Sequence, residues 1–151
     1  MEDEIIKLLE STKNQYIPSL DEINNENLEV INNAFQNYLN YKQNVENKKE
    51  SIEKIDGYHL ISFKDISKGD VIKYINFKYF YDVNLSCGGI VFKKTDRYLV
   101  IKILSGFLNI KSDNIFFRKF TPEELAKIKI MEIAKLKINF TCLCIINLRQ
   151  P

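Results

Sequence analysis

Apolar residues recur at helical spacing in the first third of the chain and at strand spacing through its middle. The helical pattern begins after Pro18, where residues 19–22 (SLDE) form a capping box that predicts a helix start. Asp56-Gly57 predicts the end, because glycine readily adopts the left-handed conformation that closes a helix. The 37 residues from 20 to 56 contain no proline or glycine. We therefore expect one long helix there, preceded by a short helix over residues 2–13.

Four large apolar residues of this long helix follow one another at alternating steps of three and four: Leu28, Ile31, Phe35 and Tyr38. That spacing is typical of a coiled-coil seam and predicts contact with a partner, either a second copy of the chain or another protein. The same seam would also suit a helix that packs on its own domain. Both interpretations remain open at this stage.

The pattern changes after Gly57 to short alternating stretches separated by Gly and Asp, which predict strands. The pair Gly88-Gly89 inside one stretch predicts a bulge or a sharp bend. Short strands at such even spacing favour a small antiparallel barrel. The expected strands are Tyr58–Phe63, Val71–Tyr81, Leu85–Lys93, Tyr98–Leu104, Phe107–Lys111 and Asn114–Phe120.

A second helix start is predicted at residues 121–124 (TPEE), where Thr121 caps, Pro122 takes the first helical position and Glu124 completes the box. We expect this helix to run over residues 122–134. From Lys135 onward apolar residues alternate, so a final strand is expected over about residues 136–148. The predicted fold is α+β, with an N-terminal helical arm over 1–57 and a barrel-like β-domain over 58–151.

Charge divides the chain at the same boundary. Residues 1–57 hold 12 acidic residues and 6 lysines, a net charge of −6, whereas residues 58–151 hold 8 acidic and 16 basic residues, a net charge of +8. Apolar residues make up 45% of the chain, enough for a packed core. The split favours two functional faces, an acidic arm and a basic β-domain.

The composition argues against catalysis and metal binding. His59 is the only imidazole, and a strand histidine next to Tyr58 and Leu60 is expected to be structural or at the surface. The three cysteines, Cys87, Cys142 and Cys144, lack zinc-ligand spacing, so we expect them to be buried, reduced and metal-free. We expect a non-enzymatic protein with no cofactor.

The acidic N-terminus does not resemble a secretory signal, so we expect the protein not to be secreted. The uncharged stretch near the C-terminus, residues 138–148, has 11 residues, whereas a membrane-spanning helix needs about 20. We expect no membrane span and a reducing compartment.

Nucleic-acid binding is the alternative function, because two strands interleave aromatic and basic residues. Two observations weigh against it: aromatic residues on strands usually belong to a core, and only 3 of the 22 basic residues are arginine. The candidate contacts are Lys73, Tyr74, Lys78, Phe117, Arg118 and Lys119.

Residues 68–75 (KGDVIKYI), 88–92 (GGIVF) and 114–118 (NIFFR) together resemble a pattern of strands in small, mostly uncharacterised proteins of giant nucleocytoplasmic DNA viruses. The resemblance covers about residues 68–120 and brings no catalytic or binding residues with it. It implies a viral structural or assembly component, a minor virion protein that acts through protein contacts with itself or another viral protein. Its expected location is the host cytoplasm or the virion.

Overall fold

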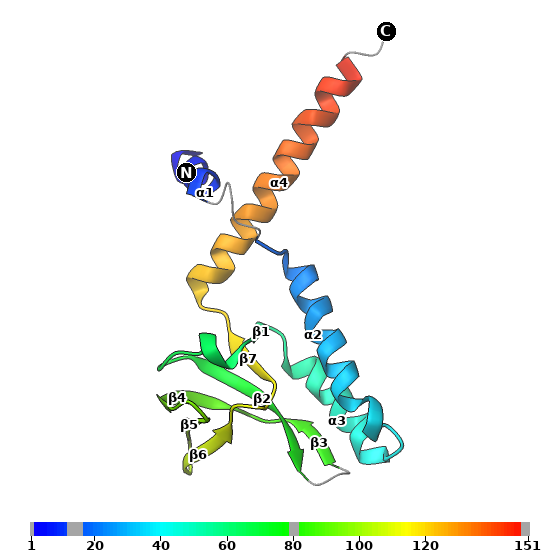
Figure 1. The fold of residues 1–151 in the computed structure, drawn as a ribbon. Coiled ribbons are helices and arrows are strands. Elements are labelled where there is room, and N and C mark those ends of the chain that lie inside the picture. Colours follow the sequence, from blue (N-terminus) through cyan, green and yellow to red (C-terminus); the bar gives the residue numbers. More distant parts are fainter. Residues whose placement is uncertain (1, 12–16, 79–81, 149–151) are drawn as a thin grey trace. The chain divides into compact units, whose positions relative to one another are not determined.

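The structure is a computed structural model that describes residues 2–11, 17–78 and 82–148, with every side chain in them except those of residues 5, 8–11, 78 and 138–148. It is an α+β fold (Figure 1). In chain order the elements are α1 (Glu2–Ser11), α2 (Leu20–Phe35), the 3-10 turn η1 (Gln36–Tyr38), α3 (Lys42–Lys54), β1 (Tyr58–Ile61), the 3-10 turn η2 (Phe63–Asp65), β2 (Val71–Lys78), β3 (Asp82–Leu85), β4 (Gly89–Lys94), β5 (Tyr98–Ile103), β6 (Gly106–Lys111), β7 (Phe116–Lys119) and α4 (Pro122–Leu148).

The strands form one antiparallel sheet in the order β1-β7-β2-β4-β5-β6, and β3 pairs with the C-terminal half of β2. Among the described residues, β1 and β6 lie at the two ends of this order and do not pair with each other. The sheet is therefore open, and the barrel expected from the strand spacing is not confirmed.

A one-residue bulge joins β3 to β4 along the same edge of β2. Ile75 faces Leu85 and Ile72 faces Gly89. An interval of three residues on β2 is therefore matched by an interval of four residues on the segment from β3 to β4. Gly88 lies in the extra step with φ of 72°, a left-handed conformation that glycine adopts without strain. The bulge predicted from the two glycines is confirmed.

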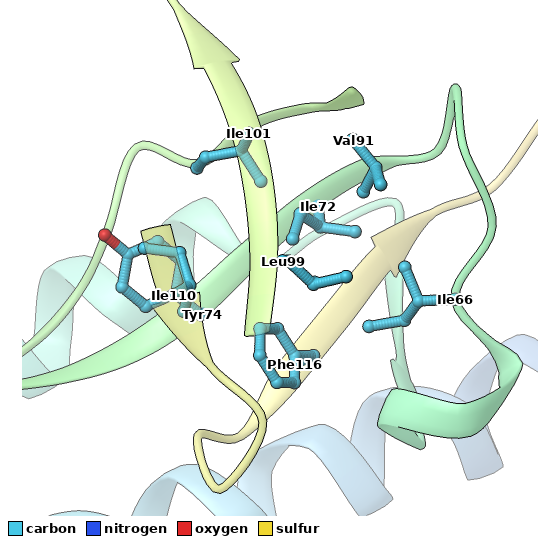
Figure 2. Packing of buried hydrophobic residues seen from close by; sticks show 8 residues of the cluster. All are labelled: Ile66, Ile72, Tyr74, Val91, Leu99, Ile101, Ile110 and Phe116. Carbon is cyan, nitrogen blue, oxygen red and sulfur yellow. The ribbon is translucent and has the colours of Figure 1, made fainter. Parts of the chain in front are cut away.

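One face of the sheet holds a buried apolar cluster, which we call the first cluster (Figure 2). Its members come from β2, β4, β5, β6, β7 and the loop before β2, and all of them are at most 8% exposed. They are Ile66, Ile72, Tyr74, Val91, Leu99, Ile101, Ile110 and Phe116.

The opposite face of β2, β3 and β7 holds a second cluster, which α2 and α3 help to cover: Ile31, Phe35, Ile55, Ile75, Val83, Leu85 and Phe117. Alternate residues of one strand point to opposite faces of a sheet. Phe116 therefore enters the first cluster and its neighbour Phe117 the second, and both are at most 1% exposed. Strands β2 and β7 thus contribute side chains to both clusters.

Buried asparagines attach the helices to β3 and β1. Asn44 accepts a hydrogen bond from the backbone N–H of Val83 at 3.2 Å, and Asn47 donates to the Val83 carbonyl at 3.0 Å. Asn27 donates to the Tyr58 carbonyl at 2.9 Å. These side chains satisfy backbone groups that packing would otherwise leave without partners.

The single helix expected over residues 20–56 is wrong, because the chain breaks into α2, η1 and α3. The reversal is stabilised by Asn44, whose amide donates to the Tyr38 carbonyl at 2.8 Å. Turning back in this way lets both helices pack on the sheet. The capping bond from the Glu22 N–H to the Ser19 hydroxyl is present at 3.2 Å, and Gly57 has the expected left-handed conformation, with φ of 81°.

Helix α4 begins as predicted and ends much later. The Thr121 N–H donates to the Glu124 carboxylate at 3.1 Å, and the Glu124 N–H donates to the Thr121 hydroxyl at 3.2 Å, so the capping box is confirmed. The helix continues to Leu148, which overturns the strand expected over residues 136–148. No glycine or proline lies between Pro122 and Pro151, so the backbone has no reason to leave the helix.

The chain divides into two compact units. Residues 1–22 and 121–151 form one unit, in which the Leu20 N–H donates to the Glu132 carboxylate at 2.8 Å. Residues 23–120 form the other, which contains most of α2, all of α3 and the whole sheet. The two units do not divide at residue 57, and Ile31 and Phe35 of α2 and Ile55 after α3 contribute to the second cluster.

Candidate functional site

The aromatic residues proposed from sequence as base-stacking contacts belong to the core. Tyr74 is 8% exposed in the first cluster, and Phe117 is 0% exposed in the second. Neither ring can stack on a base while the sheet stays folded. The structure corrects both assignments, and the physical reason is that strand alternation turns each ring towards a cluster.

Lys73 makes contacts within the protein itself. Its ammonium group donates to the Lys54 carbonyl at 2.8 Å and lies 4.6 Å from the centre of the Tyr58 ring. Partial burial lowers the pKa of Lys73, and the nearby charges of Lys54 and Lys119 lower it further, while Cys87 raises it. This lysine stabilises the junction of α3 and β2 and is a poor candidate for a phosphate contact.

The other three candidates are dispersed. Arg118 is half-buried and lines a polar pocket of about 550 Å³, together with His59 and the carboxyl groups of Asp65 and Asp70. Lys119 is exposed at the end of β7. Lys78 pairs with Asp82 through the backbone, and its side chain lies outside the described part of the structure. Of the five predicted contacts whose side chains the structure describes, Tyr74 and Phe117 are buried and the other three do not form one surface with them.

His59, next to this pocket, has a structural environment. Its ring stacks on Phe120 with the ring centres 4.5 Å apart, and its Nδ1 lies 3.1 Å from the Leu60 carbonyl oxygen. The half-buried position agrees with the structural histidine expected from the sequence. The neighbouring carboxylate of Asp70 accepts the Ser67 N–H at 2.8 Å, a bond that is typical of aspartate in turns.

The seam residues of the arm pack on their own unit. Ile31 and Phe35 are 0% exposed in the second cluster, while Leu28 and Tyr38 are half-buried. Tyr38 contacts the Phe77 ring, with the ring centres 6.4 Å apart. Ile31 and Phe35 therefore have no surface left for a partner, and the interpretation of the seam as an internal packing face replaces the one that assigned it to a partner.

A different surface remains uncovered on β4, β5 and β6, and we call it the open face. The register places Ile90 beside Lys102 and Lys102 beside Phe107, so these three residues form one row across the strands. Residues two apart on a regular strand share one face, and an irregularity of β4 between Val91 and Lys93 brings Lys93 to the same face as Ile90 and Phe92. Eight of its members are exposed and Val100 is half-buried. The open face consists of Ile90, Phe92, Lys93, Tyr98, Val100, Lys102, Phe107, Asn109 and Lys111.

Two aromatic rings meet on the open face. Phe92 and Phe107 are 50% and 56% exposed, and their ring centres lie 5.0 Å apart with the planes tilted by 57°. The ammonium group of Lys68 lies 5.6 Å from the centre of the Phe92 ring. The rings come from β4 and β6, which both pair with β5. They form an aromatic platform that helices α2 and α3 do not cover: Figure 1 shows α3 beside β3, away from β4, β5 and β6.

The three strands of the open face carry lysines and no acidic residue. Their sequences, GIVFKK, YLVIKI and GFLNIK, contain four lysines and no Asp or Glu. The inward positions Val91, Leu99, Ile101 and Ile110 are aliphatic and buried. This contrast is the sequence signal that could have identified the open face. The inward positions of these strands already supply apolar residues for a core, yet the outward positions also carry phenylalanine.

Cys87 departs from the expectation of buried cysteines, because its side chain is exposed. It lies between Ser86 and the bulge glycine Gly88 on the segment that joins β3 to β4, and it lines an apolar pocket of about 750 Å³ with Tyr74 and Leu108. The side chains of Cys142 and Cys144 lie outside the described residues.

Within the described part of the chain, no three His, Cys, Asp or Glu side chains are grouped so that they could hold a metal ion. In the same residues, no helix combines the length and the apolar character needed to cross a bilayer.

Comparison with known proteins gives no relative: no family model, no curated protein and no solved structure matches this chain.

Proposed function

We propose that this chain is a non-catalytic nucleic-acid-binding accessory protein and that the open face is its binding surface. The observation that supports the proposal is the exposed pair Phe92 and Phe107, set among lysines on strands with no carboxylate. Rings supply stacking surfaces and lysines supply charge for phosphates, the two properties that nucleic-acid-binding sheets combine.

The exposure of these rings also needs a physical reason. Each large apolar side chain left in water forgoes about 1.5–3 kcal/mol of burial. Ile90, Phe92 and Phe107 are each at least 50% exposed and lie on neighbouring positions of one sheet face. A contiguous apolar group with charged neighbours is typical of a binding surface.

The test is binding of a fluorescently labelled oligonucleotide, followed by anisotropy at several salt concentrations. We expect the double substitution Lys102→Gln and Lys111→Gln to weaken binding and to make the log–log salt dependence shallower by about 0.7 per lost contact on a single strand. The matched control is Lys42→Gln with Lys49→Gln, which removes two exposed lysines of α3. Equal effects in the two variants, or no binding by the wild type, would contradict the proposal.

A viral structural or assembly role through protein contacts is the second candidate function, and α4 supports it. Ile130, Ile133 and Leu136 of this helix are 36%, 53% and 68% exposed. The helix then continues through residues 138–148, an uncharged stretch. Such a helix suits contact with a second copy or another viral protein, as the resemblance of residues 68–120 to giant-virus proteins implies.

Sedimentation velocity of the wild type and of Ile133→Glu tests this second candidate. We expect the wild type to associate and the variant to shift towards the monomer, while Lys129→Glu, an exposed change on the same helix, leaves association unaltered. A wild type that is monomeric at every concentration would remove the support for self-assembly.

A further inference from the structure

We infer that the open face binds single-stranded nucleic acid, with an unpaired base stacked on the platform of Phe92 and Phe107. The inference rests on the proposed function and specifies its ligand. It depends on the geometry of the rings, the arrangement of the lysines around them and the absence of carboxylates from the three strands.

The rings favour unpaired bases over a duplex. Phe92 and Phe107 lie on a sheet, and about half of each side chain is exposed. In a duplex the flat sides of the bases are covered by neighbouring bases, so rings fixed on a sheet cannot reach them unless the stack is opened. A single strand can turn its bases outward and place them on aromatic side chains. The platform therefore favours an unpaired base, whose flat side is exposed, over a base that is stacked within a duplex.

The lysines surround the platform on more than one side. Lys102 lies between Ile90 and Phe107 in a row at one end of the open face, and Lys93 is opposite Val100 in the next row. Lys68 approaches the Phe92 ring from the turn before β2. Phosphates that flank a stacked base would meet a cation on either side of the rings.

The type of cation indicates low sequence preference. The basic residues of the open face are all lysine, which contacts phosphate as a point charge and lacks the planar fork that reads base edges. Stacking is tolerant of sequence because every base has a flat aromatic face. The expected ligand is therefore a single strand of broad sequence, DNA or RNA.

An acidic protein surface is the competing occupant, and the chain itself offers one. Helix α2 has four acidic residues and no basic ones: Asp21, Glu22, Glu26 and Glu29. Its exposed side chains are acidic residues and asparagines, which would meet the lysines of a second copy but leave the two rings poorly covered. The rings therefore favour a ligand with flat apolar surfaces of its own.

The experiment compares the full chain binding a labelled oligothymidine strand and a mixed-sequence duplex of the same length at about 0.1 M salt. Phe92→Leu with Phe107→Leu keeps apolar cover on the sheet and removes the rings. We expect single-strand affinity to fall about 5- to 150-fold in this double variant, as the loss of one or more base stacks requires, with little change for the duplex. Tyr41→Leu, at an aromatic residue that is 55% exposed on the segment before α3, is the control and should change neither.

The outcomes separate the two claims. If neither oligonucleotide binds, the proposed function fails. If both bind equally and Lys102→Gln weakens them while the leucine variant does not, the proposed function stands and the single-strand inference is overturned. Displacement of the strand by poly-glutamate with equal affinity in the leucine variant and the wild type would also overturn the inference, because the face would then recognise charge alone. Circular dichroism of each variant checks that the sheet remains folded.

Discussion

A β-carbon added at Gly88 would lie 1.8 Å from the carbonyl oxygen of Ile72 on the neighbouring strand. A β-carbon does not approach a non-bonded oxygen so closely, and the contact is with backbone that is held in the sheet by β7 as well as by β4. The bulge therefore tolerates only glycine at this position, for two separate reasons: its left-handed φ of 72° and the closeness of β2.

Replacing Gly88 with alanine should destabilise the fold by about 2–5 kcal/mol, because the left-handed conformation and the displaced strand both cost free energy. Gly69→Ala is the matched control. Gly69 also has a left-handed φ, of 92°, but nothing lies within 4 Å of an added β-carbon, so only the conformational cost of about 1–2 kcal/mol remains. Urea unfolding of both variants measures the difference, and equal losses would show that contact with Ile72 does not matter.

Asn44→Ala should lower the free energy of unfolding by about 1–3 kcal/mol, because it leaves the Val83 N–H and the Tyr38 carbonyl without their partner. Asn44 is 0% exposed, so water cannot replace it unless the helix moves. The control is Asn32→Ala on the exposed side of α2, where a change within about 0.5 kcal/mol is expected. Similar stability of both variants in urea would mean that Asn44 does not attach α3 to β3.

Cys87 should react rapidly with a thiol reagent in the native protein, because its side chain is exposed at the bend between β3 and β4. The measurement compares the wild type with Cys87→Ser. We expect the variant to lose one rapidly reacting thiol per chain. An unchanged fast phase would contradict the exposed position of Cys87.

Stability at alkaline pH should depend on Tyr74. Burial raises the pKa of its phenol above the ordinary 10.0, the charge of Cys87 raises it further, and a hydrogen bond with Ser86 opposes the shift. As pH rises past 10, the unfolded chain releases this proton while the native chain retains it, so stability falls with pH. The stabilising contribution is complete below pH 10 and is lost as pH passes through the raised pKa.

Thermal unfolding from pH 8 to pH 11 measures this dependence. The Tyr74→Phe variant should lose less stability across the range than the wild type. The difference isolates one phenol, because Tyr58, whose pKa burial also raises, and Lys73, whose pKa burial lowers, titrate in both proteins. Parallel curves would show that Tyr74 ionises equally easily in the native and unfolded chains.

Local signals in the sequence predict the helices, turns and strands of this fold better than they predict how those elements pair and pack. The capping box at Thr121 and Glu124, the left-handed Gly57 and the bulge at Gly88 depend on neighbouring residues only, and the structure contains all of them. The sequence does not predict the short strand β3 as a separate element, because residues 82–84 lie in no expected strand and their extended structure depends on pairing with β2.

Periodicity failed where nearly every residue is apolar. Residues 138–148 contain only three polar uncharged residues, Asn139, Thr141 and Asn147, so steps of two and steps of three or four both find apolar partners. The lack of any breaker after Pro122 was the better guide, and α4 runs through the whole segment. For apolar runs of this length, the presence or absence of glycine and proline must be considered together with the spacing of the apolar residues.

The open face was beyond sequence reasoning for a different reason. The densest aromatic and basic stretches contain Tyr74 and Phe117, but strand register turns both inward, whereas Phe92 and Phe107, separated by 15 positions, meet on the surface. Register depends on how strands pair across the sheet, which the local pattern does not encode. For the same reason, the seam of Ile31 and Phe35 could not by itself decide between a partner and the protein's own sheet.

The placement of Phe116 and Phe117 in opposite clusters creates a problem of strand slippage. A one-residue shift of β7 that places Phe117 at the position of Phe116 keeps a phenylalanine in the first cluster, so that site does not distinguish the correct alignment from the shifted one. The next residue does distinguish them, because the shift would drive the Arg118 guanidinium into the second cluster in place of Phe117, and an unpaired charge is very costly there. Arg118 therefore disfavours this shifted alignment of β7, and a leucine at this position would bring the two pairings closer in energy.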